Sequence, residues 1–356
     1  MRVLSVVGAR PQFVKAAMLS RALRQRHEEV LVHTGQHYDD LMSDIFFREL
    51  ALPPPDLNLG VGSGSQATQT ARALQGLEAA MLARKPDLVV VYGDTNSTLA
   101  GALAAAKLDL PVAHVEAGLR SYDRSMPEEI NRVVSDHVSR YLFCPTEYAV
   151  QCLEREGIAR GVYHVGDLMY DALRACLPRA IEAEAGVLEH YGVEAGAYAL
   201  ATVHRAANTD DPSKLRALFE GLAGLGLTVL LPLHPRTREA LDGAAIVPGA
   251  NIMLVEPVGY LEMLALERNA RVVLTDSGGV QREAYFLAVP CVTLREESEW
   301  PETLADGWNV LAGSDPERII VAAARPRPQK PPASVFGDGR AAEKIVETLE
   351  RDPPNR

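Results

Sequence analysis

Short apolar runs separated by helical stretches recur along the chain. Runs of this length that are rich in β-branched residues are typical of strands buried on both faces of a sheet. In the first half the expected strands are residues 2–7, 29–34, 87–92, 112–115 and 141–144. Helical stretches lie between them, including one at 66–84. Strands that alternate with helices predict parallel βαβ units and therefore an α/β fold.

The strand pattern stops and then restarts. Residues 168–196 are a helical stretch that contains Pro178 and Gly186 and no clear strand. Beyond it the expected strands are residues 197–203, 227–233, 251–256, 271–275 and 290–294. Because 356 residues are too many for one ordinary core, we expect two doubly wound, Rossmann-like domains that face each other across a cleft. We place the first at 1–170 and the second at 171–337, with 325–332 as a Pro-rich linker and a C-terminal helix at 338–356 that packs back on the first domain.

Three acids follow the expected strands of the first domain. Asp94 and Glu116 each lie just after a strand, and Glu128 opens the helix that comes next. Ligands of open parallel sheets bind outside the carboxyl ends of the strands, so these acids predict either a metal site or acid–base chemistry on an uncharged sugar or acyl carbon. Asp94 has the alternative role of a helix cap, and Glu128 and Glu129 after Pro127 make an ordinary helix start.

A second informative segment, residues 274–291, reads as a strand, a Ser-Gly-Gly turn and a helix. Glycines let a backbone approach a ligand closely, and a helix amino terminus offers unpaired N–H groups. A diphosphate would fit on Ser277, Gly278 and Gly279, with Glu283 accepting hydrogen bonds from ribose hydroxyls; alternatively Ser277 only caps the helix. The glycines of 59–65 follow no convincing strand, which disfavours a dinucleotide fingerprint there.

Cations and histidines follow three other expected strands. They are candidates for binding phosphate oxygens: Arg10 and Lys15 after the first strand, His204 and Arg205 after the strand at 197–203, and His234 and Arg236 after the strand at 227–233. A single cation after a strand is usually only an exposed surface residue. Several at the same ends of strands are less easily explained by chance.

Composition excludes several classes of function. The formal net charge of −11 disfavours a general nucleic-acid binder. No run approaches the roughly 18 apolar residues that a membrane span needs. The four cysteines form no C-x-x-C pair, which argues against a zinc site and for a reducing cytoplasm.

These residues lie in motifs that resemble the non-hydrolysing UDP-N-acetylglucosamine 2-epimerase family. The motifs are GARPQFVK, TGQHYDD, YGDTNST, HVEAGLRS, PEEINR, FCPTE, HPRTR, LTDSGG and ESEWPE, which span nearly the whole chain. The resemblance implies a GT-B-like architecture, a homodimer, and interconversion of UDP-GlcNAc and UDP-ManNAc without NAD or any other cofactor or catalytic metal. It implies active-site roles for Arg10, Lys15, Asp94, Glu116, Glu128 and His204, and a UDP-binding turn with a ribose contact at Ser277, Gly278, Gly279 and Glu283.

The chain also departs from the usual family pattern. It has GARPQ, QHYD and HRAA where members usually read closer to GTRPE, QHRE and HRRE, and Trp300 replaces an arginine used near the nucleotide. Gln12, Tyr38 and the ESEW segment resemble the branch that acts on UDP-2,3-diacetamido-2,3-dideoxy-glucuronic acid. That sugar is therefore an alternative substrate. The changed QHRE and HRRE segments line a second, activating substrate site in regulated members.

The chemistry fits these residues. The C2 hydrogen of an N-acetylhexosamine is not acidic, so loss of UDP from C1 together with that hydrogen avoids a free carbanion. Carboxylates on both faces of the sugar would serve as base and acid, and cations would stabilise the leaving diphosphate. The sequence leaves open which of the three acids is the base. It also leaves three alternatives: a hydrolysing 2-epimerase, a GT-B glycosyltransferase, and a catalytically silent nucleotide-sugar binding protein.

Overall fold

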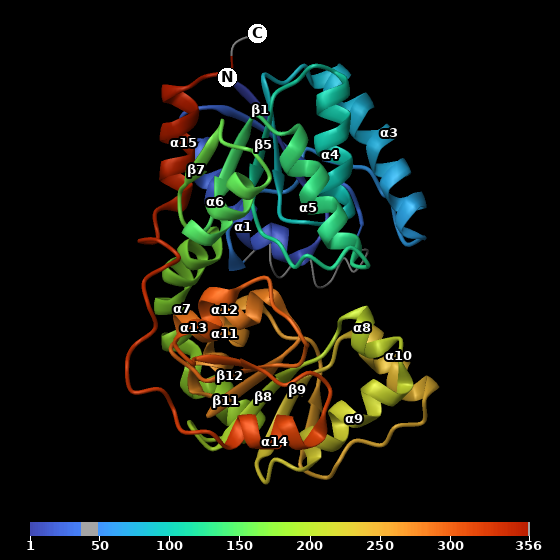
Figure 1. The fold of residues 1–356 in the computed structure, drawn as a ribbon, viewed down its shortest axis with the longest axis vertical. Coiled ribbons are helices and arrows are strands. Elements are labelled where there is room, and N and C mark those ends of the chain that lie inside the picture. Colours follow the sequence, from blue (N-terminus) through green and yellow to red (C-terminus); the bar gives the residue numbers. More distant parts are fainter. Residues whose placement is uncertain (37–48, 355–356) are drawn as a thin grey trace. The chain divides into compact units, whose positions relative to one another are not determined.

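The computed structural model describes residues 1–36 and 49–354, without the side chain of Arg10. Its contacts divide the chain into two compact units (Figure 1). Unit 1 is Met1–Arg174 with Ser334–Arg356, and unit 2 is Ala175–Ala333. Each unit contains one parallel sheet with helices on its faces, which confirms the predicted α/β fold. The expected cleft between the domains stays a prediction.

The sheet of unit 1 has seven parallel strands in the order β3-β2-β1-β4-β5-β6-β7. The strands are β1 (Arg2–Val7), β2 (Glu28–His33), β3 (Leu57–Asn58), β4 (Leu88–Tyr92), β5 (Val112–Val115), β6 (Tyr141–Cys144) and β7 (Val162–His164). The direction of winding reverses between β1 and β4. Such a switch point is where open α/β sheets bind ligands, at the carboxyl ends of the strands.

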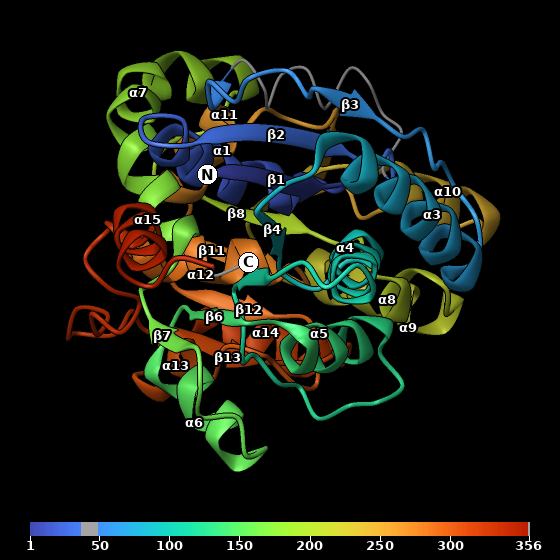
Figure 2. The ribbon, with the colours of Figure 1, turned by 90° about the horizontal axis from the view of Figure 1, so that it is seen from above.

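Helices cover this sheet because alternate strand residues point to opposite faces. On one face Leu4 and Val6 of β1 pack in a buried cluster with Leu77 of α3 (Gln66–Arg84) and Ala100 of α4 (Asn96–Lys107). Ser65 and Thr95 cap α3 and α4 by accepting hydrogen bonds from the backbone N–H groups of their first turns. Figure 2 shows α3 beside α4.

The other helices of unit 1 are α1 (Arg10–Leu23), α5 (Pro127–Val138), α6 (Glu147–Arg155) and α15 (Ala341–Arg351). The C-terminal segment belongs to unit 1, where α15 packs against α1. Its contact face consists of Ala341, Ala342, Ile345, Val346 and Leu349, which are buried at helical spacing.

The sheet of unit 2 has six parallel strands in the order β10-β9-β8-β11-β12-β13. They are β8 (Tyr198–Thr202), β9 (Thr228–Pro232), β10 (Ile252–Val255), β11 (Val272–Thr275), β12 (Cys291–Thr293) and β13 (Asn309–Leu311). One face packs on α9 (Pro212–Ala223), α10 (Pro235–Gly243) and α14 (Pro316–Ala324). The other packs on α7 (Leu168–Tyr191), α11 (Tyr260–Asn269) and α12 (Gly278–Phe286). The short helices α8 (Ala206–Thr209) and α13 (Pro301–Ala305) follow β8 and β12.

Each of the ten strands expected from the apolar runs is present. The apolar runs did not predict β3, β7 and β13, which have two or three residues each and lie at sheet edges. The glycines of 59–65, for which the sequence shows no convincing preceding strand, follow the two-residue strand β3, which ends at Asn58. That strand lies at the outer edge of the sheet, away from the switch point where a dinucleotide would bind. Of the helices in the described residues, none is long and apolar enough to cross a membrane.

Candidate functional site

Two of the three predicted acids lie on neighbouring strand ends in unit 1. β4 and β5 pair with Tyr92 opposite Val115, so Asp94 and Glu116 emerge side by side at the carboxyl edge of the sheet. Lys15 of α1 forms an ion pair with Glu116, and both side chains are at least nine-tenths buried. The acid is therefore present as a carboxylate with a fixed cation beside it.

Gly93 makes room for this ion pair. Its φ of +62° lies in the left-handed region, and a Cβ added there would lie 3.1 Å from Glu116 Oε2 and 3.2 Å from Lys15 Nζ. A side chain at position 93 would therefore strain the backbone and press on both charged groups. The YGD sequence is thus a turn that lets the backbone approach the charged pair.

Glu116 has a strained backbone. Its φ is +71°, in a region that non-glycine residues rarely occupy. The N–H groups of Glu116 and Ala117 both donate to the carbonyl oxygen of Phe143 on β6, at 3.0 and 3.1 Å, and hold this conformation. Residues held in such conformations cluster at functional sites, at a cost of about 1–3 kcal/mol each. The backbone conformation is therefore a second indication, besides its position after a strand, that Glu116 belongs to a functional site.

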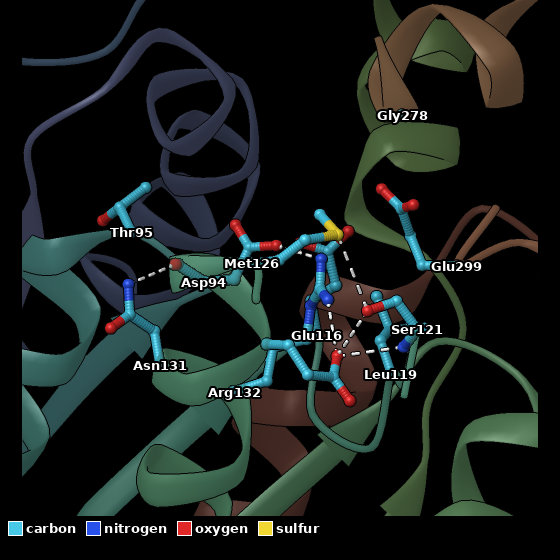
Figure 3. Close-up of polar contacts among 12 residues, drawn as sticks. Asp94, Thr95, Glu116, Leu119, Ser121, Met126, Asn131, Arg132, Gly278 and Glu299 are labelled. Atoms are coloured by element: carbon cyan, nitrogen blue, oxygen red, sulfur yellow. Dashed lines mark hydrogen bonds and ion pairs between the residues drawn. The ribbon is translucent and has the colours of Figure 1, made fainter. Parts of the chain in front are cut away.

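Helix α5 holds Asp94 from the other side (Figure 3). Arg132 donates to Asp94 Oδ2 at 2.5 Å and to Glu129 Oε2 at 2.9 Å, and its own side chain is buried. Asn131 Nδ2 donates to the carbonyl oxygen of Asp94 at 2.9 Å. Asp94 is thereby fixed through both its carboxylate and its backbone.

The two acids of PEE have different surroundings. Glu129 is buried and accepts hydrogen bonds from the N–H and hydroxyl of Ser121, the N–H of Tyr122 and the guanidinium of Arg132. These bonds make Glu129 the structural acid of the pair. Glu128 is half-buried and makes no hydrogen bond or ion pair with the residues that the structure describes. Its catalytic role stays a prediction.

A buried charged network beneath these acids was not predicted. Asp136 accepts from His114 Nδ1 at 2.7 Å, from Arg120 Nη1 at 2.7 Å and from the N–H of Gly118 at 3.2 Å. His114 Nε2 lies 2.7 Å from the carbonyl oxygen of Gly93, so the ring connects Asp136 to the turn after β4. Burial would raise the pKa of Asp136, but His114 and Arg120 outweigh it and lower that pKa below its ordinary value. The signal in the sequence was a histidine inside an otherwise apolar strand.

In unit 2, a buried aspartate organises the turn after β8. Asp276 follows β11 and is fully buried. It accepts from the N–H groups of His204 and Arg205 at 3.0 and 2.9 Å, and from Asn208 Nδ2 at 3.0 Å. The His204 ring lies 5.5 Å from the ring of His234. Asp276 was not singled out in the sequence, although it supports two residues that were.

The amino end of α12 is surrounded by charged side chains. Ser277 caps the helix by accepting from the N–H of Val280 at 3.5 Å. A Cβ on Gly278 would lie 2.6 Å from Glu299 Oε1, so a side chain at position 278 would displace the Glu299 carboxylate (Figure 3). Glu299 is buried and accepts from Arg205 Nη2 at 3.2 Å and from Arg295 Nη1 at 2.6 Å. Arg295 lies only four residues before Glu299, whereas the other partner, Arg205, comes from a distant segment that no spacing in the sequence connects to Glu299.

The other candidates of unit 2 lie near this end of its sheet. His234 Nδ1 accepts from the N–H of Arg236 at 3.2 Å and caps α10, while Arg236 pairs with the exposed Asp210 at 2.8 Å. Gly279 lies in the first turn of α12, and Glu283 further along the helix is buried. The side chain of Arg10 lies outside the described structure, which places only its backbone, at the start of α1.

Similarity to known proteins follows the same motifs. The family model for UDP-N-acetylglucosamine 2-epimerase matches residues 21–350. The chain belongs to the UDP-N-acetylglucosamine 2-epimerase family. This confirms the resemblance seen in the sequence.

Relatives cover the whole chain. A Methanococcus maripaludis protein named as a UDP-N-acetylglucosamine 2-epimerase homolog is 50% identical over 354 residues, which are 98% of this chain and 99% of that protein. The UDP-2,3-diacetamido-2,3-dideoxy-D-glucuronate 2-epimerase of Pseudomonas aeruginosa is 44% identical over 364 residues, 98% of this chain and 99% of its own. The crystal structure of Methanocaldococcus jannaschii UDP-GlcNAc 2-epimerase in complex with UDP-GlcNAc and UDP matches with a TM-score of 0.93 at 44% identity, covering 99% of this chain and all of that one.

One departure from the usual family pattern, Gln12, proves to be structural. Its Oε1 accepts from the N–H of Gly8 at 2.8 Å, and its Nε2 donates to the carbonyl of Tyr92 at 2.7 Å and to Thr98 Oγ1 at 3.0 Å. The side chain thus ties the loop after β1 to the end of β4. These bonds use both the oxygen and the nitrogen of the Gln12 amide. Gln12 therefore gives no direct information about which sugar the protein binds.

A second departure, Trp300, is also packed into the protein. Its ring is buried and lies 3.9 Å beneath the guanidinium carbon of Arg282, whose Nε donates to the carbonyl of Gly278 at 3.3 Å. A cation stacked on an indole gains up to about 2 kcal/mol when desolvated.

Tyr38, the third departure, lies outside the described residues. Within residues 1–36 and 49–354 there is no group of three or more His, Cys, Asp or Glu that could hold a metal ion.

Proposed function

We propose that this chain interconverts UDP-N-acetylglucosamine and UDP-N-acetylmannosamine by expelling UDP and adding it back. The observation that carries the proposal is the cluster at the carboxyl edge of the unit 1 sheet. There Glu116 pairs with Lys15 and Asp94 pairs with Arg132, and Glu128 opens the adjoining helix. Relatives named for this activity support the same conclusion.

The chemistry explains why several acids are required. In the elimination, the bond between C1 and the bridging phosphate oxygen breaks and UDP leaves with the electron pair. The proton on C2 passes to a carboxylate, and a C1–C2 double bond forms. Re-addition of UDP with a proton delivered to the opposite face gives the epimer. The reaction thus needs one ionised acid and one protonated acid on opposite faces of the sugar.

The ion pairs suggest how these roles are divided. A carboxylate paired with a cation is held in the ionised form that a base requires, which describes both Glu116 and Asp94. Glu128 is half-buried and has no cation bound to it among the described residues. We therefore assign the proton donor in one direction to Glu128, and the base to Glu116 or Asp94. By microscopic reversibility the roles exchange in the reverse reaction.

Unit 2 supplies groups suited to a nucleoside diphosphate. The N–H groups at the start of α12 and the partial positive charge of a helix amino terminus favour a diphosphate. The candidates for these contacts are Ser277, Gly278, Gly279, His204 and Arg205, with Glu283 for the ribose hydroxyls.

The test is incubation of the purified protein with UDP-GlcNAc in D₂O, followed by NMR. Elimination predicts deuterium at C2 of both product and recovered substrate, and scrambling of an oxygen label out of the bridge to phosphate. Epimerisation with the original C2 hydrogen retained would refute the mechanism. Release of free N-acetylmannosamine would identify a hydrolysing enzyme, and transfer of the sugar to an added acceptor would identify a glycosyltransferase.

UDP-2,3-diacetamido-2,3-dideoxy-glucuronic acid is the second candidate substrate. It is favoured by the relative from Pseudomonas aeruginosa, which is as similar to this chain, at 44% identity, as the Methanocaldococcus jannaschii UDP-N-acetylglucosamine 2-epimerase. The chemistry at C1 and C2 is the same for both sugars. Turnover of the two nucleotide sugars at equal concentration decides between them.

The assembly and location implied by the resemblance are a homodimer and the cytoplasm. The chain has a mass of 38.6 kDa, so a dimer has twice that mass in light scattering after gel filtration. A monomeric but active protein would remove the dimer from the proposal and leave the chemistry intact.

A further inference from the structure

The turn after β4 is held by side chains of three other elements. Gly93 directly follows β4, is buried, and has a φ of +62°. Gln12 of α1 donates to the carbonyl oxygen before that of Gly93 at 2.7 Å, and Asn131 of α5 donates to the one after it at 2.9 Å. The carbonyl oxygen of Gly93 itself is hydrogen-bonded to Nε2 of His114 on β5 at 2.7 Å. Three successive carbonyl oxygens are thus fixed at the turn that carries Asp94.

His114 is a polar residue inside an otherwise apolar strand. The sequence of β5 is VAHV, and all four residues are buried. An apolar residue would fill this place without the cost of burying a polar group. Both nitrogens of the ring have partners: Nε2 at Gly93, and Nδ1 at Asp136 Oδ1 of α5, 2.7 Å away. The ring therefore connects the turn after β4 to α5 through the interior of unit 1.

Asp136 extends this connection to the loop that carries the second acid. Its Oδ2 accepts from the N–H of Gly118 at 3.2 Å, and Gly118 lies two residues after Glu116. The same oxygen accepts from Arg120 Nη1 at 2.7 Å. The segments that carry Asp94 and Glu116 are thus joined to each other through one buried pair of side chains, His114 and Asp136.

We propose that His114 is a positioning residue for the elimination, which keeps Asp94 and Glu116 in a fixed arrangement through its hydrogen bond to Gly93. Gly93 directly precedes Asp94, and a Cβ added to it would lie 3.1 Å from Glu116 Oε2 and 3.2 Å from Lys15 Nζ. A shift of this turn would therefore move both acids. Misplacing a reacting group by about 1 Å can lower a rate by about 100-fold. The inference rests on the proposed function, because it takes these acids as the reacting groups.

Two amide substitutions separate the bond to Gly93 from the bond to Asp136. In His114→Gln the amide nitrogen reaches the position of Nε2 and can donate to the carbonyl oxygen of Gly93. In His114→Asn the amide nitrogen reaches only the position of Nδ1, so it can donate to Asp136 but not to Gly93. Leu77→Ala is the control for lost stability alone, because Leu77 is fully buried in the apolar cluster between α3 and the sheet.

The first measurement is steady-state turnover of the nucleotide sugar that the wild type epimerises, at a temperature at which every variant is folded. For His114→Asn we expect kcat to fall by about 100-fold, with KM and the affinity for UDP within about threefold of the wild type. For His114→Gln and Leu77→Ala we expect kcat within about fivefold of the wild type. Equal turnover of the two His114 variants would overturn the proposal, because the bond to Gly93 would then make no difference. An equal loss in Leu77→Ala would overturn it as well, because lost stability would explain the effect.

The second measurement is hydrogen exchange in the ligand-free protein, which needs no reaction. The N–H of Gly93 donates to the carbonyl oxygen of Val115 at 2.9 Å. It should exchange about tenfold or more faster in His114→Asn than in the wild type, and at the wild-type rate in His114→Gln. Unchanged exchange in His114→Asn would overturn the proposal whatever the turnover.

The outcomes keep this inference apart from the proposed function. If the wild type epimerises neither nucleotide sugar, the proposed function fails and the positioning role fails with it, while exchange still shows whether His114 holds the turn. If the wild type is active and only the His114 predictions fail, the proposed function stands. If His114→Asn does not fold, a folded His114→Gln with kcat lower by about 100-fold still refutes the proposal.

Discussion

Replacing Asp136 with asparagine should destabilise unit 1 strongly. Asp136 is fully buried and is the common partner of the His114 ring and the guanidinium of Arg120. The substitution preserves shape but removes the negative charge that the Arg120 guanidinium and the His114 ring face. Removing one partner of a buried ion pair costs about 3–5 kcal/mol. The lower end applies here, because the asparagine oxygen still accepts a hydrogen bond.

The effect has a defined size and pH dependence. In a unit of this length, each 1 kcal/mol lowers the melting temperature by about 2–4 °C, so a loss of about 3 kcal/mol corresponds to about 6–12 °C. The pKa of Asp136 is lower in the folded protein than its ordinary value of 3.8. Its ionised form therefore stabilises the fold above that pH and loses this contribution as the pH falls below it. The difference between variant and wild type should be full at pH 7 and shrink below pH 3.8.

Calorimetric melting of the variant and of a matched control measures this difference. The control is Glu343→Gln on α15, because Glu343 pairs with Arg340 at the surface of the same unit. An exposed pair contributes about 0–1 kcal/mol, so the control should melt within about 3 °C of the wild type. If Asp136→Asn also melts within that margin, the negative charge of Asp136 does not stabilise unit 1, and the prediction is refuted.

Further predictions concern turnover. Each amide substitution at a candidate acid should lower the rate by about 100-fold or more while UDP affinity stays within about threefold: Asp94→Asn, Glu116→Gln and Glu128→Gln. Near-normal turnover of Glu128→Gln would show that Glu128 only starts the helix. Lys15→Met should shift the acid limb of the pH–rate profile to higher pH, because Glu116 would lose the cation that favours its ionised form; an unmoved limb would exclude Glu116 as the base.

The fold was predictable because its strands are buried on both faces. Such strands are continuous apolar runs, and the runs at 2–7 and 112–115 match β1 and β5 residue for residue. The strands that were not predicted are shorter and more exposed. β3 and β7 contain half-exposed residues such as Leu57 and Val162 and have no apolar run to detect. Their pairing depends on the neighbouring strand and not on their own composition.

The candidate site was predictable only in part, and for a physical reason. Strand ends can be located from sequence, and they gave the positions of Asp94 and Glu116. The partners of these acids come from helices packed on the sheet, so no spacing rule in the sequence identifies Arg132 as the partner of Asp94. Nor does the sequence show that Glu129, and not Glu128, has the structural role. Gln12 was interpreted as a marker of substrate, whereas its hydrogen bonds show a local role in joining two loops.

The same ion pairs bear on which sugar the enzyme accepts. A uronic acid brings a carboxylate close to Asp94 and Glu116, and that carboxylate needs a cation of its own. In the described part of unit 1, Lys15 and Arg132 at this edge are already paired with those acids, and Arg120 is paired with Asp136 and Glu156. A sugar carboxylate would have to compete for them, which disturbs the charges that the elimination uses. A uronate substrate would therefore need a further cation near C6, and comparing the turnover of the two nucleotide sugars tests whether this protein supplies one.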